Sequence, residues 1–195
     1  AAERDDSAAQ NEIGDLFRFG KGVPQDCLVA MEWYEKAAGQ DDPRAQYNIA
    51  QLYDYALGVP LDYEKAMLWY CKAAEKGYAP AQKSIGDLYA NGTGTPVDFE
   101  QAQAWYSQAA NQGSPKAQHE LGSMFQQGHG VSRDFQVAFN WFLKAAQQNY
   151  APAQCDVGMM YHHGRGVTQD DTKAIEWLTK AAYQGQAVAQ HEVGF

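Results

Sequence analysis

One pattern of apolar and polar residues recurs along the chain at intervals of 36 residues. The stretch EWYEKAA begins at Glu32, and related stretches follow it four times. They are LWYCKAA at Leu68, AWYSQAA at Ala104, NWFLKAA at Asn140 and EWLTKAA at Glu176. A fixed period between 20 and 50 residues is typical of repeat architectures, in which each unit buries its apolar face against its neighbours.

The repeats are counted here from an alanine that is followed by glutamine. This gives five units, which are residues 9–44, 45–80, 81–116, 117–152 and 153–188. Residues 1–8 match the end of a preceding repeat, and residues 189–195 match the start of a sixth. The sequence therefore predicts one repeat domain over residues 1–195.

Both halves of each repeat have the apolar spacing of an amphipathic helix. The first half has alanine at position 1, an aliphatic residue at position 5, Leu or Met at position 8, Tyr or Phe at position 9 and usually glycine at position 12. The second half of the first repeat shows the same periodicity in Ala30, Trp33, Tyr34, Ala37 and Ala38. We call the two predicted helices of a repeat A and B. We expect the Trp and Tyr rings of the B helices to supply most of the buried apolar area.

Aspartate and glycine mark where these helices begin and end. An aspartate precedes every B helix and is expected to cap it: Asp26, Asp62, Asp98, Asp134 and Asp170. After the B helix, a residue with left-handed backbone is expected at Gly77, Gly113, Asn149 and Gly185, and Asp41 is the exception at this position. Glycine also occurs inside four A helices, at Gly14, Gly86, Gly122 and Gly158, which indicates close approach of a neighbouring helix.

Two of these stretches identify a family resemblance. Residues 45–77, AQYNIAQLYDYALGVPLDYEKAMLWYCKAAEKG, and residues 81–113, AQKSIGDLYANGTGTPVDFEQAQAWYSQAANQG, closely resemble the Sel-one-like repeat, a relative of the tetratricopeptide repeat. The resemblance covers nearly the whole chain, with local departures at Ala50, Ala56 and Leu178. It implies an all-α, right-handed superhelical solenoid of helix-turn-helix repeats. It also implies a concave groove lined by A helices that holds protein or peptide partners.

The side of the A helix opposite its apolar stripe lies at positions 3, 7, 10 and 11 of each repeat. We expect these residues to form the partner-binding stripe: Asn11, Asp15, Arg18, Phe19, Tyr47, Gln51, Asp54, Tyr55, Lys83, Asp87, Asn91, His119, Ser123, Gln127, Met159, His162 and His163. Phe19, Tyr47 and Tyr55 are expected to face solvent beside charged residues, as interface hot spots do. The alternative is that they fill gaps between adjacent A helices.

Composition narrows the choice of partner. A net charge of −9 and a pI near 4.9 disfavour nucleic acid and anionic membrane surfaces. Cys155, His162, His163 and His119 are the candidate metal ligands. A metal site is not expected, because Cys155 and His162 lie about 10 Å apart along one helix, too far to bind the same tetrahedral ion. The glycine pairs of GKG, GTG, GHG and GRG are helix connectors, and no cofactor is expected.

Three function classes follow from this sequence. The first is a scaffold or adaptor that binds a protein or peptide in the groove. The second is a purely structural segment that positions other domains of a longer chain. An enzyme comes third, because no nucleophile, base and orienting group converge in the repeats.

Compartment and chain ends give weaker expectations. Cys27, Cys71 and Cys155 occupy different repeat positions, which favours a reducing cytosol, although Asn91-Gly92-Thr93 is a possible glycosylation sequon. The ends fall within repeats, so we expect a piece of a longer protein whose uncapped ends could associate end to end.

Overall fold

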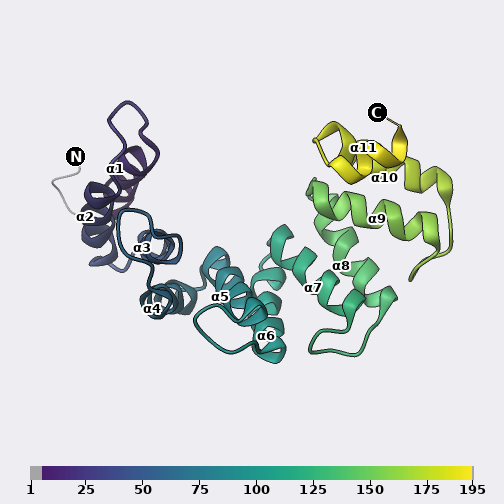
Figure 1. Ribbon diagram of the computed structural model, residues 1–195, viewed down its shortest axis with the longest axis horizontal. Helices are drawn as coiled ribbons and strands as arrows, with labels where there is room; N and C mark the ends of the chain where they lie inside the picture. The colour runs from purple at the N-terminus through teal and green to yellow at the C-terminus, as the bar shows by residue number, and fades with distance from the viewer. Residues whose placement is uncertain (1–5, 195) are drawn as a thin grey trace. The chain divides into compact units, whose positions relative to one another are not determined.

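The computed structural model describes residues 6–194, and this part of the chain is helical, with no strand. Eleven helices, joined by short loops, make up the described residues (Figure 1). They are α1 (Ser7–Phe19), α2 (Cys27–Ala38), α3 (Pro43–Asp54), α4 (Tyr63–Glu75), α5 (Ala79–Asn91), α6 (Phe99–Asn111), α7 (Pro115–Gln127), α8 (Phe135–Gln147), α9 (Ala151–His163), α10 (Asp171–Tyr183) and α11 (Ala187–Val193). Of the predicted terminal part-repeats, residues 1–5 and 195 lie outside the described residues.

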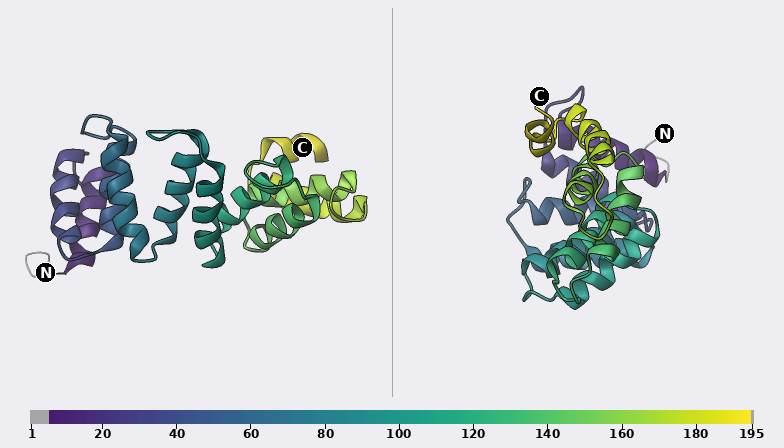
Figure 2. Two further views of the ribbon diagram at one scale, coloured as in Figure 1. Left: turned by 90° about the horizontal axis from the view of Figure 1, so that it is seen from below. Right: turned by 90° about the vertical axis from the view of Figure 1, so that its right-hand side faces the viewer.

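The chain divides after Val97 into two compact units. Unit 1 contains α1 to α5, and each of these helices packs against the next (Figure 2). Unit 2 contains α6 to α11, again with each helix packed against the next. The odd-numbered helices are the predicted A helices and the even-numbered ones are the predicted B helices. Within residues 6–194, no helix is both long and apolar enough to cross a membrane.

The predicted aspartate caps are confirmed in all five B helices. Asp26 Oδ1, for example, accepts hydrogen bonds from the backbone nitrogens of Leu28 at 2.9 Å and Val29 at 3.1 Å. The same type of cap begins α4, α6, α8 and α10. These carboxylates satisfy backbone N–H groups that have no partner within the helix, so they have a structural role.

The cores are built from the residue that follows each tryptophan. Tyr34, Tyr70 and Phe142 are fully buried at this position. A Cβ added at Gly122 would lie 2.6 Å from the Phe142 ring, and one at Gly14 would collide with the Tyr34 ring. The predicted close approach of a neighbouring helix to the helical glycines is therefore confirmed in these two A helices. The group that covers each glycine is the aromatic ring of a B-helix residue.

The tryptophans contribute less to the core than the sequence suggests. All five are only half-buried. In four of them, a lysine from the next turn of the same helix lies over the ring. Lys72 Nζ, for example, lies 4.0 Å from the Trp69 ring centroid. One face of these four Trp rings meets a cation, and the fully buried rings of the B helices are the Tyr or Phe residues that follow.

The glutamine after each repeat's first alanine is a buried connector between repeats. In Gln82, Gln118 and Gln154 the side-chain Nε2 donates to the carbonyl oxygen of the residue eight positions earlier, at the end of the preceding B helix. Gln118 and Gln154 also accept a 2.8 Å hydrogen bond from a glutamine 30 residues later. The side chain thus adds a second hydrogen bond to a carbonyl at the end of the B helix, which also accepts one from the backbone of the following turn.

Candidate functional site

The residues of the predicted binding stripe lie on A helices of both units. In unit 1 they lie on α1, on α3 and its C-terminal residue Tyr55, and on α5. In unit 2 they lie on α7 and α9. Within each unit, the structure brings together some of these side chains and buries others.

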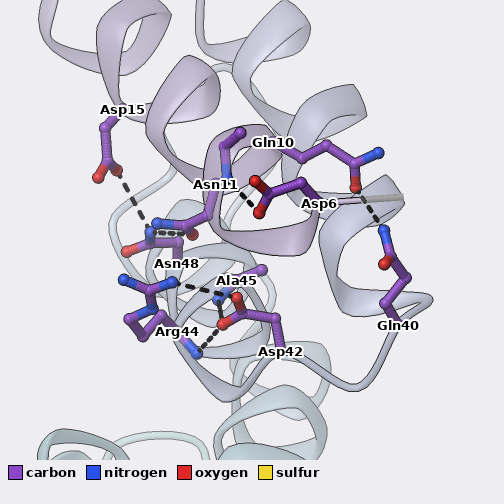
Figure 3. Close-up of polar contacts among 10 residues, drawn as sticks. Asp6, Gln10, Asn11, Asp15, Gln40, Asp42, Arg44, Ala45 and Asn48 are labelled. Atoms are coloured by element: carbon purple, nitrogen blue, oxygen red, sulfur yellow. Dashed lines mark hydrogen bonds and ion pairs between the residues drawn. The ribbon is translucent and has the colours of Figure 1, made fainter. Parts of the chain in front are cut away.

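Asn48 joins α1 to α3 in unit 1. Its Nδ2 donates to Asn11 Oδ1 at 3.0 Å and to Asp15 Oδ1 at 3.3 Å, as Figure 3 shows. Its Oδ1 accepts from Arg18 Nη1 at 3.3 Å, and the same nitrogen of Arg18 donates to Gln51 Oε1 at 2.8 Å. Neighbouring A helices are therefore fastened through polar side chains, where a solvated stripe was expected.

This network removes two residues from the predicted binding surface. Asn11 is only 4% exposed and Arg18 only 9% exposed. The next A helix covers both side chains and supplies their hydrogen-bond partners. The prediction that they are available to a partner is wrong, because a periodicity argument on one helix does not include the helix of the following repeat.

Tyr47 is also a packing residue. Its half-buried ring lies 5.6 Å from the Tyr70 ring and 5.4 Å from the Tyr78 ring, and its hydroxyl accepts a 2.7 Å hydrogen bond from Gln51 Nε2. Burial raises the pKa of the Tyr47 hydroxyl. The Tyr47 ring therefore packs against the B helix of its own repeat and against the residue before α5, and its expected exposure to solvent is wrong.

Phe19 and Tyr55 differ from Tyr47 because they are exposed. Phe19 is 55% exposed and Tyr55 is 61% exposed. They occupy equivalent positions in consecutive repeats, and the next equivalent residue, Asn91, is exposed as well. Arg18 Cζ and Lys21 Nζ lie 5.1 Å and 5.4 Å from the Phe19 ring centroid. We call the surface formed by Phe19, Tyr55 and Asn91 the A face of unit 1.

A pocket of about 290 Å³ adjoins Tyr55 on this face. It is lined by residues of α3, α4, α5 and the loop after α5: Asp54, Tyr55, Tyr63, Ser84, Asp87, Leu88, Asn91 and Thr93. Two of these residues are aspartates from different A helices. Asp54 Oδ2 accepts a 2.9 Å hydrogen bond from the Tyr70 hydroxyl, and Asp87 Oδ2 lies 2.6 Å from Lys83 Nζ.

The electrostatics of this pocket are dominated by carboxylates. Burial raises the pKa of Asp54, the Tyr70 hydrogen bond opposes that change, and the negative charge of Asp87 raises the pKa further. A raised carboxyl pKa means that the charged form of Asp54 is disfavoured where it lies. A positive charge placed between Asp54 and Asp87 would favour the charged form of both carboxylates.

In unit 2, His119 occupies the place that Tyr47 has in unit 1. Its Nε2 lies 2.8 Å from Asp156 Oδ2 on the next A helix, and its ring packs against Phe142 and Tyr150 with centroids 5.3 Å and 5.5 Å away. Nδ1 is 3.8 Å from Glu120 Oε1, an ion-pair distance beyond hydrogen-bond reach. Burial opposes the charged imidazolium, but Asp156 and Glu120 outweigh it and raise the pKa of His119 to about 9.

The remaining predicted residues of unit 2 form no comparable cluster. Ser123 and Met159 are half-buried, whereas Gln127 and His163 are exposed. His162 Nδ1 lies 2.9 Å from Asp171 Oδ1 at the start of α10. Across residues 6–194, no group of three His, Cys, Asp or Glu side chains is placed to hold a metal ion.

Position 4 of the A helix was missing from the predicted site. The structure shows that Asn48 and Asp156 at this position bind position 3 of the preceding repeat, 37 residues earlier. Every repeat has a polar or charged residue here: Glu12, Asn48, Ser84, Glu120 and Asp156. That regularity is visible in the sequence and could have identified the inter-repeat contact.

The Sel1 repeat profile matches the chain five times in succession, at residues 7–42, 43–78, 79–114, 115–150 and 151–186. The chain therefore belongs to the Sel1 repeat family, whose members are all-helical solenoids and generally protein-interaction scaffolds. These matches begin two residues before the alanine-based count, at the first residues of α1, α3, α5, α7 and α9. No curated protein matches this chain.

Solved structures with the same architecture are similar over almost all of the chain. A protective antigen of uropathogenic Escherichia coli strains with an SLR fold is 37% identical, with a TM-score of 0.90 over 99% of this chain. This chain spans 41% of that antigen's length. A Sel1 repeat protein from Oxalobacter formigenes is 36% identical, with a TM-score of 0.93 over 97% of this chain and 78% of its own. A putative Sel1 repeat protein from Klebsiella pneumoniae is 25% identical, with a TM-score of 0.65. The match covers 99% of this chain and 94% of the Klebsiella chain.

Proposed function

We propose that this chain is a protein-interaction scaffold whose partner binds the A face of unit 1. The observation that carries the proposal is the exposure of Phe19 and Tyr55, at 55% and 61%, at equivalent positions of adjacent repeats. Neither side chain is part of the hydrogen-bond network that joins α1 to α3. Paired exposed aromatics are enriched among residues that dominate binding energy at protein interfaces.

The surroundings of these two rings support the same proposal. The network of Asn48, Arg18 and Gln51 lies beside them and holds the two A helices in a fixed relation. A surface that is already ordered loses little conformational freedom when a partner binds, which favours affinity. Each ring can therefore contribute its apolar area without a rearrangement of the backbone beneath it.

The experiment compares partner capture by three forms of the full chain. The first is wild type, the second carries Phe19→Ser and Tyr55→Ser, and the third carries Tyr183→Ser. Tyr183 is a suitable control because it is 76% exposed but lies on the B helix α10. Proteins captured from a lysate of the source organism are identified and quantified by mass spectrometry.

We expect at least one protein to be retained by wild type and by the Tyr183 variant and lost with the double variant. Hot-spot aromatics contribute about 2 kcal/mol or more each, so the affinity should fall by about 30-fold or more for each ring removed. Equal capture by all three forms would contradict the proposed site. It would favour the alternative in which the repeats only position other domains.

A further inference from the structure

We infer that the pocket beside Tyr55 holds a lysine or arginine side chain of the partner protein. The inference rests on the proposed function and specifies the chemistry of the partner at one point of the A face. Its basis is the convergence of two carboxylates and an exposed aromatic ring on one pocket of unit 1.

The pocket has walls suited to a long side chain with a cationic end. Tyr55 forms an exposed wall, and Tyr63 lies under the loop that follows α5. That loop is held close to Tyr63, because a Cβ added at Gly94 would collide with the Tyr63 side chain. Aromatic faces attract lysine and arginine cations, and the methylene groups of these side chains pack on apolar surface.

The charge in the pocket favours a cation over other occupants. Asp54 and Asp87 face it from α3 and α5, and Lys83 is paired with Asp87. Within residues 6–194, Asp54 has no ion-pair partner, since its hydrogen bond comes from the neutral Tyr70 hydroxyl. Two carboxylates are therefore offset by one ammonium group, and an added cation would pair with Asp54.

An acidic segment does not fit this pocket, because its carboxylates would face Asp54 and Asp87 at close range. Like charges brought together at an interface oppose binding. A purely apolar side chain would remove the water around both aspartates without replacing its hydrogen bonds, which is also unfavourable. A basic side chain supplies hydrogen-bond donors for the carboxylates and an apolar stem for the tyrosines.

The test uses peptides selected on the full chain. A library of random 12-residue peptides is displayed on phage and enriched for binding, and the selected sequences are read. We expect lysine or arginine to be enriched at one position. The best peptide is then synthesised in two forms, one with its basic residue and one with a neutral replacement. Citrulline replaces arginine, and norleucine replaces lysine. Dissociation constants are measured by fluorescence anisotropy.

Three forms of the protein separate the pocket from general electrostatic attraction. Asp54→Asn removes the charge but keeps an oxygen that can accept from Tyr70. Asp87→Asn removes the second charge. Glu32→Gln is the matched control, since Glu32 is exposed on the B helix α2 of the same unit. Circular dichroism and thermal melting confirm that all variants are folded.

We expect citrulline or norleucine to weaken binding to wild type about tenfold, and Asp54→Asn to remove most of that difference. Glu32→Gln should bind within about twofold of wild type. Selected peptides without a preferred basic position would overturn the inference while leaving the proposed function intact. A basic preference that persists in both aspartate variants would also overturn it. Failure to select any peptide, together with equal partner capture by the Phe19 and Tyr55 variant, would overturn both proposals.

Discussion

The Tyr34 hydroxyl donates a 2.6 Å hydrogen bond to Oδ1 of Asp15. The ring of Tyr34 is fully buried and covers Gly14, the residue before Asp15. Burial, then the bond to Asp15 and its negative charge, raise the pKa of the Tyr34 hydroxyl, so it remains a donor at neutral pH. A core residue of the B helix therefore fixes a polar residue of the neighbouring A helix.

Replacing Tyr34 with phenylalanine should destabilise the protein by about 1–2 kcal/mol. The apolar ring is retained, but Asp15 loses its 2.6 Å donor, and among the described residues the 3.3 Å bond from Asn48 is left. Urea denaturation followed by circular dichroism measures the change. Tyr161→Phe is the control, because Tyr161 is half-buried and its hydroxyl makes no hydrogen bond within the described residues; equal losses in the two variants would contradict the assigned role.

Ala56→Gly should increase stability by about 1 kcal/mol. Ala56 has φ of 52°, in the left-handed region that side chains with a Cβ disfavour. The equivalent residues of the other four repeats are glycines, with φ between 64° and 79°: Gly20, Gly92, Gly128 and Gly164. Thermal melting checks the prediction, and an unchanged or lower melting temperature would show that Ala56 is unstrained.

Replacing a second alanine with glycine should change stability in the opposite direction, and it serves as the control. Ala104 is exposed within α6, where the backbone is right-handed helix. Ala104→Gly should therefore destabilise the protein by about 1 kcal/mol through the lower helix propensity of glycine. Opposite shifts in the two variants would identify backbone conformation as the cause.

His119 should make stability depend on pH. Its pKa is raised from 6.5 to about 9 in the folded protein, so the folded state binds the proton more tightly than the unfolded state. The contribution is fully present below about pH 6.5 and is lost as pH rises through about 9. We expect about 1–3 kcal/mol between these limits, since one pKa unit corresponds to about 1.4 kcal/mol.

The measurement is the urea midpoint of wild type and His119→Gln from pH 6 to pH 9.5. The groups facing the imidazole are Asp156, Glu120, Phe142 and Tyr150. Glutamine can still donate to Asp156 but cannot carry a positive charge. The difference between the two proteins should shrink as pH rises, and a constant difference would show that the charge of His119 does not contribute.

The sequence predicted those features that each repeat determines by itself. Asp26 caps α2 because its carboxylate is adjacent to the free N–H groups of the same helix, and this local geometry follows from spacing alone. The core position of Tyr34 and the position of Gly14 within its helix could also be predicted from the 36-residue period. The half-buried state of Trp69 could not. Its ring is covered on one side by Lys72.

The binding stripe was less predictable because adjacent repeats complete it. Arg18 and Tyr47 are on the polar side of their own A helices, but residues of the next repeats or helices cover them. Phe19 and Tyr55 lie at the end of the A helix, and they remain exposed. The difference between these two groups requires the relative placement of helices and not only their periodicity.

Site-specific photocrosslinking tests the central claim, that the A face of unit 1 contacts a protein partner, most directly. A benzophenone amino acid is introduced at Tyr55 in one form of the full chain and at Tyr183 in another, and crosslinks are formed in the source cells. We predict that position 55 captures a discrete partner that position 183 does not, and that Phe19→Ser reduces the crosslink. The same crosslinks from both positions, or no crosslink from position 55, would contradict the account.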